Sequence, residues 1–321
     1  MLSNSIWLVW QYQTRNHSMS RELGVPLYEL ISSKSGLRRY VELSIKTIQI
    51  VKKEQPRVIF CQNPSIVLAF LCTLLFQSKK RKIVVDEHNA GLFPLDGKNR
   101  LLNIIANFIV RRADLVIVTN VALYDYCKKI GGEPIIVPDP LPVLPSSEIV
   151  TKDEVPFQIL FICTWASDEP IQEVMEACSH FSENEIKVLV TGNPKGMSQN
   201  DAPACVQLTG FISKEDYFNY LISSDAVVVL TKRENCLNCG AYEAVSAEKP
   251  GILSNTEALR AYFSNGFLYV DNTVDDIRQK IIDLKENSDH LEQEVKYLKS
   301  ELKKKSDNRI DDLKTAVEAL F

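Results

Sequence analysis

Short apolar segments alternate with amphipathic ones through the first 140 residues of the chain. The apolar segments are rich in Val, Ile and Leu and too short for buried helices, so they predict strands at residues 6–10, 58–61, 82–85, 115–118 and 135–137. Apolar positions three or four apart predict helices between them, at residues 38–53, 64–76, 99–112 and 122–130. Such alternation is typical of an α/β protein with a parallel, doubly wound sheet.

A proline-rich segment ends this first pattern. Residues 138–145 contain four prolines, which continue neither a helix nor a central strand, so we expect a linker at residues 143–156. The alternation then begins again, with strands predicted at residues 158–163, 187–190, 206–208 and 226–230 and helices at 170–178 and 214–223. The chain is therefore predicted to have two Rossmann-like domains, at residues 1–142 and 157–273, that face each other across a cleft.

The last segment, residues 274–321, is predicted to form a helical extension. Apolar residues recur in it at spacings of three, four or seven, at Leu284, Leu291, Val295, Leu298 and Leu302. Such a stripe can form a coiled coil with a second chain. We favour the alternative in which the extension packs back on the first domain.

The composition is that of an ordinary globular protein, with 45% hydrophobic and 24% charged residues. The best apolar run, residues 66–76, has 11 residues, against the roughly 20 that a membrane span needs. The N-terminus has neither the basic region nor the small-residue cleavage site of a signal peptide, and several of the eight cysteines stand in apolar runs. We therefore expect a cytoplasmic protein.

Charge is distributed unevenly along the chain. Residues 1–145 hold 19 Lys and Arg against 11 Asp and Glu, whereas residues 146–321 hold 18 against 30, so the first half should face something anionic. Nucleic acid is not expected, because the chain has no zinc-finger spacing, RNA-binding aromatic motif or basic heptad helix. The basic residues 79–82 and 111–112 each follow an apolar helix, which favours an anionic surface at the inner membrane face. The alternative is that these charges are solvated helix ends.

One turn of the second half has the features of an anion site. The strand at 226–230 is followed by a polar turn, a short helix that Pro250 ends, and a further apolar run at 251–253. The start of such a helix offers unpaired N–H groups and a positive dipole end to a phosphate. Glu243, one turn further on, can accept hydrogen bonds from ribose hydroxyls, and Lys232 and Arg233 are expected to face a diphosphate.

Other loops at the same sheet edge should complete this nucleotide site. After the strand at 158–163 we expect diphosphate contacts, with Asp168 as the cap of the next helix. After the two following strands we expect contacts with the base and ribose. The residues concerned, with those of the turn and helix start, are Thr164, Trp165, Ser167, Gly192, Gly210, Phe211, Ile212, Glu234, Asn235, Asn238, Cys239 and Gly240.

These segments, in order along the chain, resemble known glycosyltransferases. Residues 163–170, CTWASDEP, resemble the Ser-Trp-Thr-x-Asp-Glu segment of the β-mannosyltransferases that act on dolichol-linked chitobiose. Residues 62–64, QNP, and 85–89, VDEHN, are similar to that family's Gln-x-Pro-Pro and Asp-Trp-His-Asn segments. Residues 243–250, EAVSAEKP, look like the Glu-Ala-Met-Ala-x-Gly-Lys-Pro stretch of glycosyltransferase family 4. The resemblance implies the GT-B fold.

The chain also departs from this pattern. The family pairs two glutamates eight residues apart, but Asn235 stands eight before Glu243, and Glu234 is one position away. Retaining members use the first acid on the donor sugar, so its displacement favours an inverting mechanism. Glu248 replaces the small residue that usually precedes Lys-Pro. No Asp-x-Asp metal motif stands where a metal-dependent enzyme would have it, so no metal is expected.

An inverting transfer needs a base for the acceptor hydroxyl. His88, just past a strand end, is expected to line the cleft, and Asp86 and Glu87 could orient it or act as the base themselves. The alternative is that His88 only binds the loop backbone. Residues 13–18 form either an acceptor-contacting loop or a plain surface loop. The pair Cys236 and Cys239 lacks the second pair or the His of a zinc site.

The sequence therefore predicts a glycosyltransferase of hexosyltransferase type for polysaccharide biosynthesis. The donor would be a nucleotide-diphosphate sugar, with UDP or GDP, and the acceptor a lipid-linked or polysaccharide chain; no resident cofactor is expected. Two alternatives stay open. A nucleotide-sugar 2-epimerase would share the fold and the donor site, and a partner subunit that has lost its chemistry would keep both.

Overall fold

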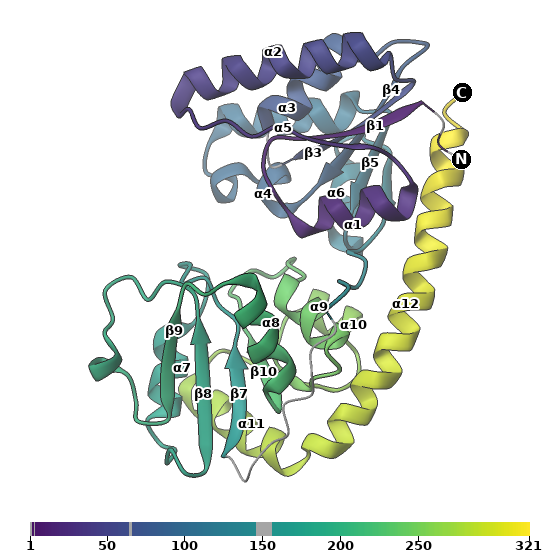
Figure 1. Cartoon of the computed structure of the whole chain (residues 1–321). Coiled ribbons are helices and arrows are strands. Elements are labelled where there is room, and N and C mark those ends of the chain that lie inside the picture. Colours follow the sequence, from purple (N-terminus) through teal and green to yellow (C-terminus); the bar gives the residue numbers. More distant parts are fainter. Residues whose placement is uncertain (1, 3, 64–65, 146–155) are drawn as a thin grey trace. The chain divides into compact units, whose positions relative to one another are not determined.

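The computed structural model describes residue 2 and residues 4–63, 66–145 and 156–321. Pro64, of the resembling segment 62–64, and most of the linker expected at residues 143–156 lie outside these residues. The chain divides into two compact units, Met1–Pro140 with Lys304–Phe321, and Leu141–Lys303 (Figure 1). Each unit contains one six-stranded sheet. The expected α/β class with two Rossmann-like parallel sheets is confirmed.

The first unit has all its strands parallel, in the order β2-β1-β3-β4-β5-β6. Asp86 of β4 lies opposite Gln62 of β3 and Ile117 of β5, so the carboxyl ends of these strands meet at one edge. Polar residues that follow the strands are thereby collected in one place. The strands are β1 Ser5–Val9, β2 Leu27–Glu29, β3 Val58–Asn63, β4 Lys82–Glu87, β5 Leu115–Val118 and β6 Pro134–Ile136.

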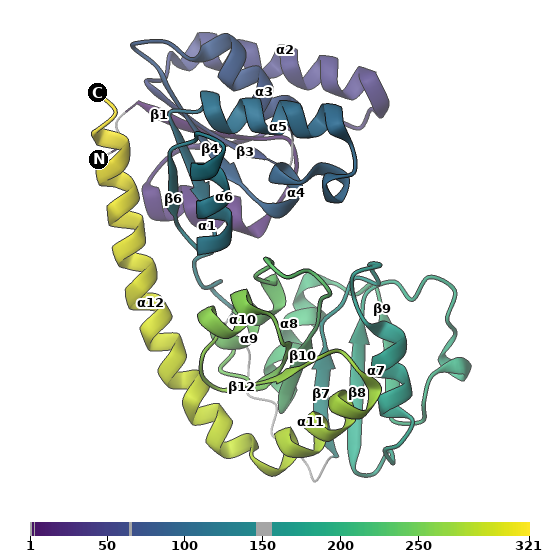
Figure 2. The same cartoon turned by 180° about the vertical axis from the view of Figure 1, so that it is seen from behind.

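Alternate residues of this sheet face two different helical layers. Ile6 and Leu8 of β1 pack with residues of helices α2, α3, α5 and α6, whereas Trp7 and Val9 pack with α1 and the last turns of α12 (Figure 2). The helices are α1 Thr14–Leu23, α2 Gly36–Glu54, α3 Ile66–Leu71, the π-helical η1 Cys72–Phe76, α4 Asn89–Leu92, the 3-10 helix η2 Pro94–Gly97, α5 Arg100–Arg112 and α6 Val121–Lys129.

The second unit repeats the arrangement with the order β12-β11-β10-β7-β8-β9. Helices α7 and α11 cover one face of the sheet, and α8 and α9 cover the other. The strands are β7 Phe157–Phe161, β8 Ile186–Thr191, β9 Val206–Gly210, β10 Ala226–Val229, β11 Gly251–Ser254 and β12 Phe267–Val270. The helices are α7 Ile171–Cys178, η3 Gln199–Asp201, α8 Lys214–Ser223, α9 Cys239–Ser246, α10 Glu257–Tyr262 and α11 Val274–Glu286.

The long helix α12, Ser288–Glu318, buries its apolar stripe inside this chain. Val295, Leu298 and Leu302 pack in the core of the second unit. Leu313 and Val317, in the last turns, pack in the core of the first unit, to which residues Lys304–Phe321 belong. The stripe is therefore used within the chain, and the coiled-coil alternative is wrong.

Three α-helices (α1, α4 and α10) and two strands were not foreseen from the pattern. The expected loop at 13–18 is the start of helix α1, and β2 and β12 were missed. Helix α1 has few apolar residues, but its Met19 and Leu23, four apart, are buried. Its other buried residues are polar, so its helical periodicity is invisible on a hydrophobicity scale. In the described part of the chain, no helix combines the length and apolar character needed to cross a bilayer.

Candidate functional site

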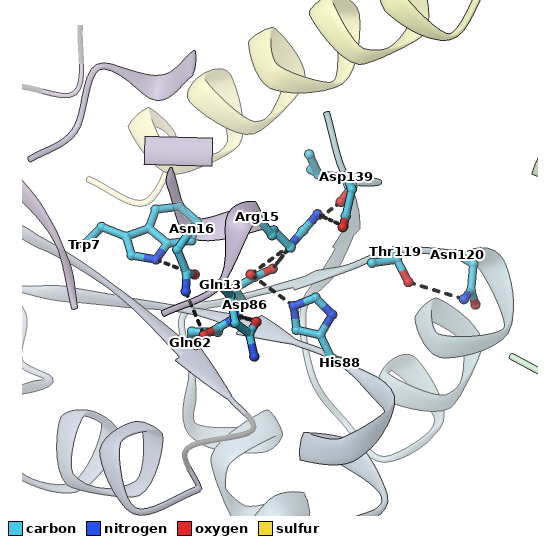
Figure 3. Close-up of polar contacts among 11 residues, drawn as sticks. Trp7, Gln13, Arg15, Asn16, Gln62, Asp86, His88, Thr119, Asn120 and Asp139 are labelled. Atoms are coloured by element: carbon cyan, nitrogen blue, oxygen red, sulfur yellow. Dashed lines mark hydrogen bonds and ion pairs between the residues drawn. The ribbon is translucent and has the colours of Figure 1, made fainter. Parts of the chain in front are cut away.

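A buried ion pair organises the carboxyl edge of the first sheet. The guanidinium of Arg15, in α1, donates from Nε to Oδ2 of Asp86 at 3.0 Å and from Nη2 to Oδ1 at 2.8 Å (Figure 3). Both side chains are almost fully buried. Burial alone would raise the pKa of Asp86, but the charges of Arg15 and His88 outweigh it and hold this pKa well below its usual range. Asp86 is therefore a permanent carboxylate.

Arg15 also connects this pair to the last strand of the sheet. It donates from Nη1 to the carboxylate of Asp139 and from Nη2 to the carbonyl oxygen of Val137, at 2.9 Å. Both acceptors follow β6. A single guanidinium thus joins α1, β4 and the segment after β6, and its planar set of donors suits several acceptors at once.

His88 stands beside this pair. Its Nε2 lies 3.4 Å from Oδ2 of Asp86, and about a quarter of its side chain, 26%, is exposed. Because Asp86 faces Nε2, the other ring nitrogen, Nδ1, is the one that can take a proton from another group. Among the residues described, the group that faces Nε2 of His88 is the Asp86 carboxylate and not the loop backbone, which was the expected alternative.

Glu87 has a different environment from its neighbour. It is completely buried, and Asn63 donates to its Oε1 at 2.9 Å. Its Oε2 has no hydrogen-bond partner among the residues described. A Cβ on Gly91 would come within 2.4 Å of that oxygen, so only glycine fits there. Burial raises the pKa of Glu87 to about 8, and a group so enclosed and protonated does not suit the expected role of base.

A chain of amides supports the same edge. Trp7 Nε1 donates to Asn16 Oδ1 at 3.2 Å, Asn16 Nδ2 donates to Gln62 Oε1 at 2.8 Å, and Gln62 in turn donates to Gln13 (Figure 3). Asn16 and Gln62 are buried, so their polar groups need these partners. The expected plain surface loop at 13–18 is therefore wrong, because Arg15 and Asn16 belong to the interior.

In the second unit, the loop after β7 binds a carboxylate of its own. Glu169 accepts from the backbone N–H of Thr164 at 3.0 Å, from that of Ala166 at 2.7 Å and from the Thr164 hydroxyl at 3.2 Å. Trp165, between them, has a positive φ of 60°, which turns both N–H groups toward one point. Backbone N–H groups arranged in this way bind anions. The loop expected to receive a diphosphate thus already holds an acidic side chain, while Ser167 is exposed.

Asp168 joins that loop to the end of β10. It accepts from the hydroxyl of Thr231 at 3.1 Å and lies 3.3 Å from Nε of Arg233. The backbone N–H of Lys232 donates to the Asp168 carbonyl oxygen, and its side chain pairs with Glu173 at 3.1 Å. Asp168 does not cap α7, whose first turn receives no side-chain cap, because its carboxylate is turned toward β10. The two cations expected to face a diphosphate are thus brought beside the loop after β7.

Gly192, at the end of β8, allows a close approach between loops. Its φ is 85°, and a Cβ there would lie 2.6 Å from the carbonyl oxygen of Cys163. Trp165 Nε1 donates to the carbonyl oxygen of Thr191, at 2.9 Å, and so closes the loop onto β8. Gly210, also with positive φ, pairs with Thr191 from β9. The expected glycines therefore do lie at adjoining strand ends.

The start of α9 packs against these strand ends. A Cβ on Gly240 would come within 3.1 Å of side-chain atoms of Ile162 and Val229, so the glycine lets the helix approach β7 and β10. Asn238 is the N-cap residue of this helix, but its side chain makes no capping hydrogen bond. Its Oδ1 is buried without a hydrogen-bond partner in the described part of the chain. The helix start and the loop after β7 are thus neighbours.

Glu243 lies one turn into α9 and is engaged by the neighbouring helix. The hydroxyl of Tyr217, in α8, donates to its Oε2. Burial raises the pKa of Glu243, although the Tyr217 hydrogen bond acts in the opposite direction. The carboxylate expected to accept from a ribose therefore has an internal donor, which the sequence did not indicate.

The remaining expected residues lie more openly. Phe211 is 94% exposed, directly after Gly210, and Ile212 is half-buried. Glu234 and Asn235 form an exposed turn, so the displaced acid is on the surface. Cys236 is half-buried and Cys239 exposed. Over the described ranges, no three His, Cys, Asp or Glu side chains gather as they would to hold a metal.

Four residues of these two edges were missed in the sequence: Arg15, Asp139, Glu169 and Tyr217. Each acts through a partner that is distant in the chain or turned back on its own loop, and only Glu169 stands in one of the resembling segments, residues 163–170. The only signal was their position, since each of the first three follows a strand end in a polar segment.

Comparison with known proteins now adds to this geometry. Residues 146–301 match the family model of glycosyl transferases group 1. No curated protein matches the sequence. Solved structures of similar fold include the sucrose-phosphate synthase of Thermosynechococcus elongatus, with a TM-score of 0.75 at 12% identity over 99% of this chain and 100% of that one.

Two further structures resemble the chain. Anabaena Alr3699/HepE, solved in complex with UDP and glucose, has a TM-score of 0.70 at 11% identity, with 99% of this chain and 100% of that chain covered. A crystal structure described as a UDP-N-acetylglucosamine 2-epimerase from Listeria monocytogenes has a TM-score of 0.62 at 11% identity, with 91% of each chain covered. At these identities the structures establish the fold alone, and the family match shows that residues 146–301 are similar to glycosyl transferases group 1.

Proposed function

We propose that this chain, a glycosyltransferase of the GT-B fold, moves a sugar from a nucleotide-diphosphate donor to a lipid-linked or polysaccharide acceptor. The second unit binds the donor. One observation carries the proposal: the loop after β7, Lys232 and Arg233 after β10, and the start of α9 adjoin at a single strand-end edge. This edge also lies within residues 146–301, the region that matches the family model.

The donor's parts then have separate partners. The diphosphate lies near Lys232 and Arg233 and the start of α9, where cations and unpaired N–H groups favour phosphate. The ribose hydroxyls donate to Glu243. The base lies by Gly210, Phe211 and Ile212, with UDP and GDP as the candidates. UDP is supported by the Alr3699/HepE structure of similar fold, which was solved with UDP and glucose. These cations take the place of a metal, so we propose metal-independent transfer.

In the first unit, His88 acts as the base for the acceptor. Its Nδ1 takes the proton of the acceptor hydroxyl as that oxygen bonds the sugar's anomeric carbon, and the bond from this carbon to the diphosphate breaks. Asp86 positions the imidazole through Nε2. The displacement of Glu234 from the usual acidic position supports an inverting outcome. The likeness of residues 163–170 to chitobiose β-mannosyltransferases supports a lipid-linked acceptor.

A nucleotide-sugar 2-epimerase is the second candidate, because a structure described as such an enzyme shares the fold. Its TM-score, 0.62, is lower than those of the sucrose-phosphate synthase and Alr3699/HepE structures, 0.75 and 0.70. A partner subunit without chemistry is the third, and the carboxylate of Glu169 in the anion-binding loop is the observation that favours it.

The experiment is a thermal-shift screen of the whole chain against UDP-, GDP- and dTDP-sugars, followed by product analysis. A ligand that binds the folded state raises the melting temperature by mass action. We expect a rise with one nucleotide series, and sugar transfer only when an acceptor is added. An epimerised sugar formed without acceptor would establish the second candidate. The absence of any shift across the three series would overturn donor binding.

A further inference from the structure

Exposed large apolar side chains are concentrated in the first unit. Of 17 such residues in the described part of the chain, three lie in the second unit: Val143, Phe211 and Tyr297. Isolated exposed apolar residues need no explanation, but a surface on which they gather does. Most of those in the first unit belong to the helical layer formed by α2, η1 and α5.

Helix α2 carries the clearest stripe. Leu37, Val41 and Ile45, four residues apart, are 78%, 52% and 51% exposed. Leu43 and Val51, on the other side of the helix, are buried against the sheet. The helix is thus apolar on two faces, and the sheet accounts for only one. The exposed stripe borders an open groove of about 540 Å³.

Neighbouring helices extend this surface. Leu101 and Ile104 of α5 are each 66% exposed, and Leu74 and Leu75 of η1 are 54% and 55% exposed. Helices α2, α3 and α5 cover the same face of the first sheet, with α3 in contact with both others (Figures 1 and 2). We call this set the α2–α5 surface: Leu37, Val41, Ile45, Leu74, Leu75, Leu101 and Ile104.

The charges around the α2–α5 surface are mostly basic. Helices α2 and α5 together hold eight Lys and Arg against two Glu. Beside the α2 stripe, Lys34, Arg38 and Lys46 surround one acid, Glu42, which Lys46 and Lys34 pair at 2.6 and 3.1 Å. The pKa of Glu42 is accordingly lowered, to about 2, by its hydrogen bonds with Lys46, Lys34 and Ser32. The stripe therefore keeps a net positive border.

The basic segment 79–82 contributes less than its sequence suggests. Arg81 donates to the carbonyl oxygen of Pro56 at 2.9 Å, and Lys82 pairs with Asp114 at 3.2 Å. Both are half-buried, whereas Lys79 and Lys80 are exposed. Half of this segment thus holds the unit together. The expected apolar helix at 66–76 is similarly divided, with Leu68 and Phe76 buried.

We propose that the α2–α5 surface docks on an anionic lipid bilayer. The apolar stripe enters the boundary between headgroups and acyl chains, and the basic border binds the lipid phosphates. A second copy of the chain fits less well, because a two-fold contact would place the same basic residues against each other. The inference rests on the proposed function in one respect: a bilayer is where a lipid-linked acceptor would be met.

The test is flotation of the whole chain with vesicles of phosphatidylcholine alone or with about a third phosphatidylglycerol. We expect binding to the mixed vesicles that weakens as salt rises. A variant with Leu37→Ser, Val41→Ser and Ile45→Ser should lose at least about tenfold in binding. A second variant, Arg38→Gln with Arg100→Gln, should lose the preference for the anionic lipid. The matched control is Val143→Ser with Tyr297→Ser, which removes exposed apolar side chains from the second unit.

Circular dichroism and thermal melting establish that each variant is folded, and light scattering gives its mass. Equal vesicle binding by the wild type and the triple variant would overturn the proposal. So would a wild-type dimer that the triple variant loses and that binds no vesicles, because the partner would then be a second copy. Donor binding by calorimetry, measured in parallel, separates the two proposals: it should persist in the triple variant, and its failure would concern the transferase function alone.

Discussion

Arg15 and Asp86, 71 residues apart in sequence, form a two-pronged ion pair in the interior of the first unit. The pair lies beside His88 and receives further support from Asp139. Removing one partner of such a pair leaves the other buried without its counter-charge. The stability of the folded chain should therefore depend strongly on this ion pair, which also orients His88, the candidate base.

Arg15→Ala should lower the free energy of unfolding by about 3–5 kcal/mol, the usual cost of breaking a buried pair. Urea denaturation measures this change. The same substitution at Arg21, on the same helix, is the control. Arg21 pairs with Glu22 at 3.3 Å, and the two side chains are 57% and 40% exposed. Arg21→Ala should therefore lower the free energy of unfolding by less than about 1 kcal/mol. Equal effects of the two substitutions would contradict the assigned role of Arg15.

Glu87 should make the protein less stable as the pH rises. Burial raises its pKa to about 8 from 4.5, so the folded chain keeps a proton that the unfolded chain releases. The stabilisation is complete below the unfolded pKa and is lost between about pH 4.5 and pH 8. Its size is at most about 5 kcal/mol.

Glu87→Gln should remove this pH dependence while keeping an oxygen for Asn63 to bind. Denaturation curves from pH 5 to 8.5 compare it with the wild type, and Glu133→Gln, at an exposed site, is the control. A variant whose stability falls with pH as steeply as that of the wild type would show that Glu87 is not the responsible group.

His88→Ala should leave donor affinity unchanged and lower turnover by about 10²-fold or more, because the acceptor proton then has no base. Donor affinity comes from calorimetry, and turnover from the release of nucleoside diphosphate in the presence of acceptor. His17→Ala in the same unit, at an imidazole paired with Glu29, is the control and should keep its rate. A wild-type rate in the His88 variant would exclude it from the mechanism.

Glu243→Ala should weaken donor binding by about 1.5–3 kcal/mol, the value of a charge-assisted hydrogen bond. Tyr217→Phe is the informative partner, because it removes the internal donor and leaves the carboxylate available. We expect the Tyr217 variant to bind the donor as tightly as the wild type or more tightly. If calorimetry with UDP- and GDP-sugars gave one affinity for all three proteins, the ribose contact would lie elsewhere.

Glu169→Ala should strengthen the binding of UDP or GDP several-fold. The substitution frees the N–H groups of Thr164 and Ala166, which the carboxylate now occupies, and removes a negative charge near the diphosphate. Glu176→Ala, an exposed acid further along α7, changes the net charge equally and should have little effect. Weaker binding by the Glu169 variant would show that this carboxylate supports the donor site.

The sequence was sufficient for the architecture because the signals are local. Strand and helix periods differ, and each is visible within ten or so residues, so α8 was predicted to its observed bounds and most strands to within two residues. The proline-rich segment likewise marked the change of unit, which the structure places after Pro140. Helix α12 was foreseen, but its division between two cores was visible only in the structure.

The tertiary structure decided which groups each polar or charged side chain contacts. Asp86 and Glu87 are adjacent in sequence, yet one is held ionised by Arg15 and the other is buried with its proton. Lys79 and Arg81 stand two residues apart, yet one is solvated and the other is bound to backbone. The sequence by itself determined most of the segments that form strands and helices, because backbone preference and hydrophobic period act over short stretches. Only packing determined what each polar group meets, because the burial and electrostatic energies that set its state depend on residues brought from elsewhere in the chain.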